Sequence, residues 1–112
     1  MKIIISKTFN KKYLQKLSKY FSTEELVNKL KNKETNICLK YPHFKIKLKI
    51  GLVEFRWIIL IKDNKYIIPI VICLKKDKNC WENIMWSKYE KQALNIQEKV
   101  FIDIQNKDYE AY

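Results

Sequence analysis

The clearest pattern in the chain is an alternation of apolar and basic residues over residues 44–50, which read FKIKLKI. Alternation with a period of two is typical of a β-strand that has one buried face and one exposed face. A second apolar segment, residues 53–61, follows after Gly51 and Leu52. A two-residue loop that begins with glycine favours a type II′ turn. We therefore predict a β-hairpin over residues 44–61.

The predicted register of this hairpin separates an apolar face from a charged face. The apolar pairs are Ile50 with Val53, Leu48 with Phe55 and Ile46 with Trp57. On the charged face, Lys49 is opposite Glu54 and Lys47 is opposite Arg56. Like charges directly opposite each other destabilise a hairpin unless an anion lies between them. Arg56 is also the only arginine in the chain, which suggests that its planar fork is needed there. We predict that this face is the functional surface.

The segment before the hairpin predicts a strand and two helices. Residues 1–5 form a short apolar run that favours a strand. Ser6 or Thr8 can cap a first helix whose apolar positions lie on one stripe. Ser22 and Glu25 have the spacing of a capping box, so a second short helix is predicted to begin there.

The segment after the hairpin predicts a third meander strand and a C-terminal helix. Residues 62–65 are typical of a turn, and residues 66–74 form the returning strand. Pro69 within that strand argues for an edge position or a bulge. Residues from about 81 to 101 favour a helix. Its apolar positions are Ile84, Met85, Tyr89, Leu94 and Ile96.

These elements predict a single α+β domain over residues 1–102, followed by a flexible acidic tail over residues 103–112. The sheet is expected to be small and antiparallel, with the N-terminal strand added to a three-strand meander. Two N-terminal helices and a C-terminal helix complete the expected fold. A chain of 112 residues can build one core without disulfide or metal support.

The charge of the chain favours polyanionic partners. The formal net charge is +11, and all of the positive excess lies in residues 1–80, while residues 81–112 are slightly acidic. A charge of this size is a sign of polyanion binding rather than of any particular fold. The longest apolar run, residues 66–74, is too short to cross a bilayer. We therefore expect no membrane association and a cytoplasmic location.

The cysteines give no sign of a metal site. Cys38, Cys73 and Cys80 are odd in number and lack the paired spacing of zinc ligands. The simplest interpretation is that they are reduced thiols. We expect neither a metal nor a cofactor.

The order and spacing of these segments resemble the RelE/ParE superfamily of small bacterial toxins from type II toxin–antitoxin modules. The resemblance is carried by residues 9–17 (FNKKYLQKL), by residues 44–48, by the Phe-Arg pair at 55–56, and by an apolar strand that runs into residues 75–77 (KKD). It covers roughly residues 1–85 and implies a RelE-like fold.

The RelE branch implies a metal-independent endonuclease that cleaves mRNA on the ribosome. Such chemistry needs a base for the ribose 2′-hydroxyl, cations for the phosphorane, and a proton for the leaving oxygen. The resemblance assigns the catalytic positions to Lys45, Lys47, Arg56 and Lys76. The expected RNA-binding residues are Lys49, Lys75, Lys78 and Trp81. The implied partner, besides mRNA, is a cognate acidic antitoxin that forms a hetero-oligomer with the toxin.

This sequence departs from the family pattern at the proton-transfer positions. RelE proteins carry arginine where Lys76 stands and a tyrosine shortly beyond it, and the nearest aromatic residue here is Trp81. Tryptophan can stack on a base but cannot pass a proton. A lysine at its ordinary pKa, near 10.4, is a poor base at neutral pH. Crowding by Lys49 and Arg56 would lower the pKa of the neighbouring lysines at 45 or 47, the direction that a base requires.

Other interpretations remain open. A ParE-like inhibitor of DNA gyrase would share the fold without needing catalytic residues, and a basic RNA-binding module would need no catalysis. The lysine stripe can be a solvated face or a guard against edge-to-edge aggregation. His43 is more often structural than catalytic in such a position. Trp81, Trp86 and Tyr89 can serve helix packing rather than base stacking.

Overall fold

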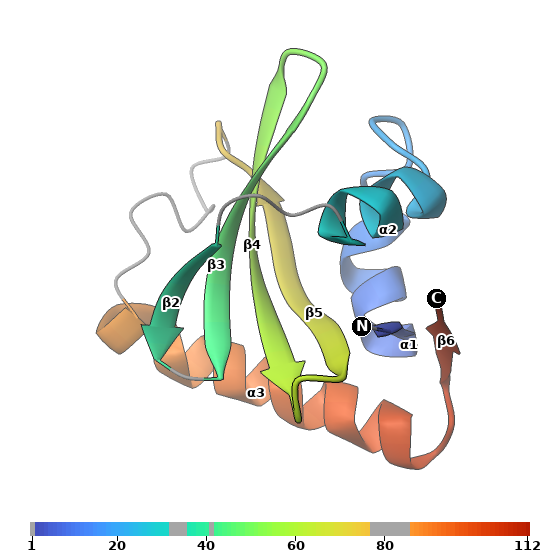
Figure 1. Cartoon of the computed structure of the whole chain (residues 1–112), viewed down its shortest axis with the longest axis vertical. Helices are drawn as coiled ribbons and strands as arrows, with labels where there is room; N and C mark the ends of the chain where they lie inside the picture. Colours follow the sequence, from blue (N-terminus) through green and yellow to red (C-terminus); the bar gives the residue numbers. More distant parts are fainter. Residues whose placement is uncertain (1, 32–35, 41, 77–85) are drawn as a thin grey trace.

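The computed structural model describes residues 2–31, 36–40, 42–76 and 86–112 and has an α+β architecture (Figure 1). The described elements are three α-helices, one π-helical turn and six strands that join in one mixed sheet. In chain order they are β1 (Lys2–Ser6), α1 (Lys7–Phe9), the π-helical turn η1 (Asn10–Leu14), α2 (Thr23–Lys31), β2 (Asn36–Lys40), β3 (His43–Ile50), β4 (Val53–Lys62), β5 (Tyr66–Leu74), α3 (Trp86–Gln105) and β6 (Tyr109–Ala111).

The sheet has the strand order β2-β3-β4-β5-β1-β6. Strands β2 to β5 form antiparallel neighbours, whereas β1 runs parallel to β5 and antiparallel to β6. The prediction of a purely antiparallel four-strand sheet is therefore wrong in its details. The helical segment after β1 carries the chain across one face before the meander begins, so β1 and β5 can pair in the same direction. The α+β class itself is confirmed.

The predicted hairpin register is confirmed at every predicted pair of β3 and β4. Gly51 adopts φ 60°, whereas the φ of Leu52 is not positive. A positive φ at the first loop position alone is the geometry of a type II′ turn. The single glycine of the chain thus stands where its conformational freedom is required.

The turn from β4 to β5 and the position of Pro69 are only partly as predicted. Asp63 and Asn64 both have φ 54°, and Lys65 N donates to Lys62 O over 3.0 Å, as in a type I′ turn. Strand β5 lies between β4 and β1, so an edge position for Pro69 is wrong. The pairing of β4 with β5 instead shifts register beside Pro69, which confirms the predicted bulge.

One face of the sheet packs against α1, η1 and α2. Ser6 caps α1 by accepting a hydrogen bond from Phe9 N over 3.1 Å. The capping box at α2 is confirmed, because Glu25 N donates to Ser22 Oγ and Ser22 N donates to Glu25 Oε1. The buried side chains of this layer are Ile3, Ile5, Phe9, Leu14, Phe21, Leu26, Val27, Leu30, Ile46, Phe55, Trp57, Ile59, Ile61, Ile67, Ile72 and Leu74.

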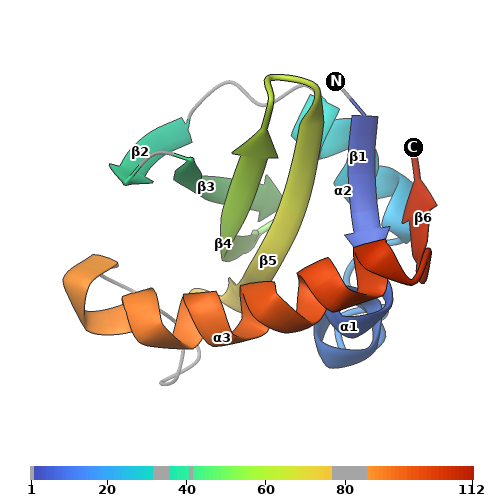
Figure 2. The same ribbon diagram turned by 90° about the horizontal axis from the view of Figure 1, so that it is seen from below.

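Helix α3 packs against the opposite face and crosses the sheet at one end (Figure 2). Its buried residues Ala93, Ile96 and Val100 belong to a second core with Ile58 on β4 and other strand residues. Leu94, predicted on the apolar face, is 42% exposed. The prediction is wrong for Leu94, because the neighbouring Ala93 is the buried residue, but it is confirmed for Ile96, which is buried in the second core. Of the other predicted apolar positions, 84 and 85 lie outside the described residues, as does the predicted start of the helix near residue 81.

The C-terminal segment is built into the fold rather than separate from it. Helix α3 continues to Gln105, and β6 pairs with β1 at the edge of the sheet. Asp103 Oδ2 accepts a hydrogen bond from Thr8 N over 2.7 Å, and Lys7 N donates to Asp108 O. The boundary predicted at residue 103 therefore falls inside α3.

Two further predictions concern the membrane and the cysteines. No helix in the described ranges is long and apolar enough to cross a membrane. Cys73 on β5 is disulfide-bonded. The interpretation of all three cysteines as reduced thiols is therefore wrong, because sequence spacing alone does not reveal which cysteines the sheet brings together.

Candidate anion-binding site

The basic side chains of β3 lie on the face of the sheet that α3 only partly covers. His43 pairs with Leu60, a residue of the core beneath α3, and alternate residues of β3 share this face. His43 is 6% exposed, and its Nε2 donates to Gln97 Oε1 on α3. Lys45 is half-buried, whereas Lys47 is exposed. Burial thus decreases along the strand from α3 towards the hairpin tip.

His43 therefore has a structural position. It joins β3 to α3 inside the protein instead of facing the open part of the surface. The open part begins at Lys45 and continues through Lys47, as the sequence predicted for the functional face.

Arg56 lies at the border between the packed core and this open surface. It stands between Lys47 on β3 and Cys73 on β5, and the next residue on the same face of β4 is the buried Ile58. The Arg56 side chain is only 9% exposed, and its Nη1 is buried without a hydrogen-bond partner among the described residues. Burying a charged donor without a partner is costly, and such groups concentrate at functional sites. A bound anion would satisfy this donor.

Lys45 has a perturbed protonation equilibrium. Its pKa is lowered from 10.5, first by burial and then by the positive charges of Lys47 and Arg56. The direction agrees with the prediction, but its largest cause is burial of the Lys45 side chain, which the sequence did not reveal. Lys45 is thus more readily neutral than a free lysine.

The paired positions of β3 and β4 nearest the hairpin tip include one member of an ion pair. Glu54 is opposite Lys49 as predicted, and its Oε2 lies 3.0 Å from Lys75 Nζ. The hydrogen bond from Lys75 and its charge lower the pKa of Glu54, with smaller contributions from Lys49 and Lys47. Glu54 therefore pairs with Lys75. Much of the charge of Lys75 is compensated by this pair.

The structure brings together most of the predicted site residues. Lys45, Lys47 and Arg56 form adjacent positions of β3 and β4. Lys49, Lys75 and Lys76 lie nearer the hairpin tip and line a shallow groove there. The remaining two predicted residues, at positions 78 and 81, lie outside the described part of the chain. The hydrogen-bonding status of Arg56 could not be predicted, because it depends on the tertiary packing around β4 rather than on the spacing of residues in the sequence.

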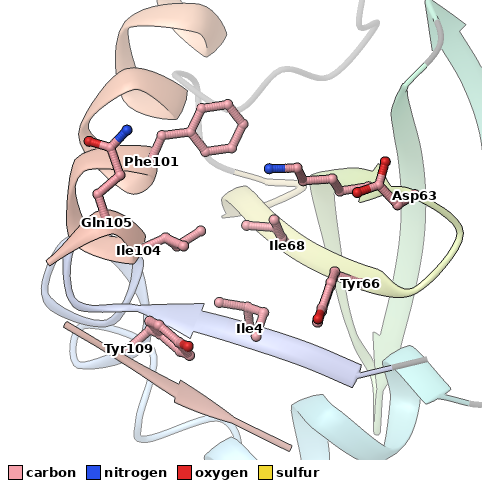
Figure 3. Close-up of a pocket in the computed structure, with 9 residues that line it drawn as sticks. Ile4, Asp63, Tyr66, Ile68, Phe101, Ile104, Gln105 and Tyr109 are labelled. Carbon is pink, nitrogen blue, oxygen red and sulfur yellow. The ribbon is translucent and has the colours of Figure 1, made fainter. Parts of the chain in front are cut away.

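A second hollow lies at the opposite end of the molecule (Figure 3). Its lining residues are Ile4, Lys62, Asp63, Tyr66, Ile68, Phe101, Ile104, Gln105 and Tyr109. Lys62 Nζ lies 5.7 Å from the centre of the Phe101 ring, within the range of a cation–π contact. This hollow could not be predicted from the sequence, because residues of β1, β5, α3, β6 and the turn after β4 all line it. It contains no buried charged group without a partner, so it is a weaker candidate than the surface around Arg56.

Within the described residues, no group of three or more His, Cys, Asp or Glu side chains could hold a metal ion. A scan against models of protein families, a search of curated proteins and a search of solved structures each found no match to this chain. The chemistry of the site must therefore be argued from its own side chains.

Proposed function

We propose that this protein binds RNA on the face formed by β3, β4 and β5 and cleaves it without a metal, as a ribosome-dependent mRNA endonuclease toxin of the RelE type. The observation that carries the proposal is the buried guanidinium of Arg56, whose Nη1 has no partner and which lies beside Lys47. Arginine suits a phosphate because its fork can donate two parallel hydrogen bonds. Dependence on the ribosome and the toxin role rest on the resemblance to RelE proteins.

The described side chains can fill most of the roles in RNA cleavage. The neutral form of Lys45 would take the proton of a ribose 2′-hydroxyl as that oxygen attacks the adjacent phosphorus. Arg56 would stabilise the negative charge that develops on the phosphorane oxygens. As the bond to the 5′-oxygen breaks, the ammonium group of Lys47 would return a proton to that oxygen. The products would be a 2′,3′-cyclic phosphate and a 5′-hydroxyl, and Lys76 would contact a flanking phosphate.

The proposed function is tested in a reconstituted translation system. Addition of the purified protein should stop synthesis and leave mRNA fragments with 2′,3′-cyclic phosphate ends. Binding of RNA without any fragments would contradict cleavage and leave a basic RNA-binding module. Inhibition of DNA supercoiling by purified gyrase, with translation unaffected, would establish the ParE-like alternative instead.

The cleavage rate should depend on the protonation state of Lys45. Because the pKa of Lys45 lies below 10.5, the rate should rise with pH and level off before that value. Lys45→Arg keeps the charge but removes the base, so cleavage should fall by about 10²-fold or more while RNA binding remains. Single-turnover cleavage of mRNA on ribosomes across the neutral and alkaline range measures both effects. The control variant Lys49→Arg should keep the wild-type profile, and an unchanged profile in Lys45→Arg would exclude Lys45 as the base.

Removal of the carboxylate of Glu54 should strengthen RNA binding. Glu54→Gln releases Lys75 from its ion pair and removes a negative charge beside Lys49. One further phosphate contact should make the salt dependence of RNA binding steeper by about 0.7 in a plot of log K against log salt. Fluorescence anisotropy with a labelled RNA measures the slope. Glu24→Gln removes the same charge at an exposed position of α2 and should leave the slope unchanged. An equal effect of both variants would mean that only net charge matters.

The partner predicted from the resemblance is an acidic antitoxin. We propose that it is attracted by the net charge of +11. Such long-range attraction should make the association rate fall as salt rises.

A further inference from the structure

The tip of the β3–β4 hairpin carries an apolar side chain in an unusual setting. Leu52 is 96% exposed, although it is the second loop residue of a turn that accepts polar residues equally well. The hairpin extends away from α3 and the rest of the sheet (Figure 1). The side chain of Leu52 therefore contributes nothing visible to the core and is presented to solvent at the end of a projecting arm.

A groove lies next to Leu52. Its lining residues are Lys49, Leu52, Val53, Glu54, Lys75 and Lys76. Lys75 is paired with Glu54, whereas Lys49 and Lys76 make no ion pair with another described residue. The groove thus combines an exposed apolar wall with two cations that form no ion pair with a described residue. An unpaired nucleotide presents the matching chemistry, an apolar base face joined to a charged phosphate.

The groove continues the surface that contains Arg56. Lys47 and Lys49 are alternate residues of β3 and lie on one face, about 7 Å apart along the strand. This separation is comparable to that of successive phosphates in an extended single strand. A strand whose phosphate contacts Arg56 and Lys47 can therefore place its next phosphate near Lys49 and its base near Leu52.

We infer that the hairpin tip is a second nucleotide-binding subsite, in which Lys49 and Lys76 hold a phosphate and Leu52 packs on the face of an unpaired base. This inference rests on the proposed RNA binding at Arg56 and extends it by at least one nucleotide along the chain. The nucleotide is unpaired because stacking in a duplex hides the base faces from a side chain. The subsite would give the protein a preference for single strands that is independent of the cleavage step.

The test compares how protein variants bind RNA oligonucleotides in which every 2′-hydroxyl is methylated. These oligonucleotides can bind but cannot be cleaved. Leu52→Ser should weaken binding of a single-stranded hexanucleotide about fivefold without changing the salt slope. It should not change binding of inorganic phosphate, which has no base that could pack on Leu52. Lys76→Ala should instead reduce the salt slope by about 0.7. Leu94→Ser, which alters an exposed leucine of α3, is the matched control and should bind as the wild type does.

Several results would overturn the subsite. Equal binding of the hexanucleotide by Leu52→Ser and wild type would show that no base contacts the tip. An equal loss with an RNA duplex of the same sequence would mean that Leu52 recognises paired RNA, and a loss confined to anionic vesicles would make the tip a membrane contact. Failure of the proposed function is separable, because a Leu52-dependent affinity without cleavage of unmodified mRNA removes the endonuclease and leaves the subsite. Cleavage of unmodified mRNA without any dependence of binding on Leu52 would instead remove the subsite and leave the endonuclease.

Discussion

Replacement of Arg56 by methionine should make the protein more stable while it removes most of its affinity for RNA. The guanidinium is buried with an unpartnered Nη1, so the folded protein bears the cost of a desolvated charge. An apolar side chain of similar length avoids this cost, and the free energy of unfolding should rise by roughly 1–3 kcal/mol. Loss of the charge-assisted, bidentate hydrogen bonds from the guanidinium to phosphate should weaken RNA binding by about thirtyfold, since such bonds contribute about 2 kcal/mol. Chemical denaturation and fluorescence anisotropy measure the two changes.

Arg56→Lys is the matched variant, because it keeps the charge and removes the fork. Cleavage and growth arrest should fall sharply, whereas the thermal midpoint should barely move. Full activity of Arg56→Lys would show that the site needs a charge but no guanidinium. A destabilised Arg56→Met protein would mean that Arg56 supports the fold, and the interpretation of its burial as a functional cost would be wrong.

Deletion of residues 106–112 should strongly destabilise the protein. The backbone of Ile3 donates to and accepts from Tyr112, and β6 pairs with the buried strand β1 through the positions opposite Ile4, Ile5 and Ser6. Loss of these hydrogen bonds, at about 1 kcal/mol each, should reduce the free energy of unfolding by about 3 kcal/mol or more. Thermal and denaturant unfolding of the shortened chain measure the effect.

A charge-only variant separates pairing from electrostatics in this segment. The double substitution of Asp108→Asn with Glu110→Gln keeps the backbone of β6 and should retain nearly wild-type stability. If the shortened chain is as stable as the full chain, β6 is dispensable, and the prediction of a separate acidic tail would be restored. Because β6 and the hairpin lie at different places in the strand order, RNA affinity of the folded protein should be unchanged by the double substitution.

Features that depend on short-range patterns could be predicted from the sequence. The register of β3 and β4 follows from strict alternation and from a turn that begins with Gly51, because a slip by one residue would expose the entire apolar face. The capping box at Ser22 follows from a side chain and a backbone three residues apart. Burial is the largest cause of the lowered pKa of Lys45, but the smaller contributions of Lys47 and Arg56 follow from the charges that this register places beside it.

Features that depend on long-range packing could not be predicted in this way. Strand β6 has an exposed, polar sequence, and only its backbone pairing with β1 makes it part of the sheet. The parallel direction of β1 depends on how the helices cross the sheet. The burial of Arg56 depends on the tertiary packing around β4, and the pairing of Glu54 with Lys75 depends on the register of β5 against β4. None of these leaves a periodic signal in one segment.

The central claim, that Arg56 binds a phosphate of RNA, can be measured directly because Arg56 is the only arginine of the chain. Protein labelled with ¹⁵N-arginine should give a single side-chain Nε–Hε signal in an NMR spectrum. Titration with a non-cleavable single-stranded RNA should shift this signal and slow the exchange of its proton with water. The account would be contradicted if the arginine signal stayed in place and kept its exchange rate while the RNA bound.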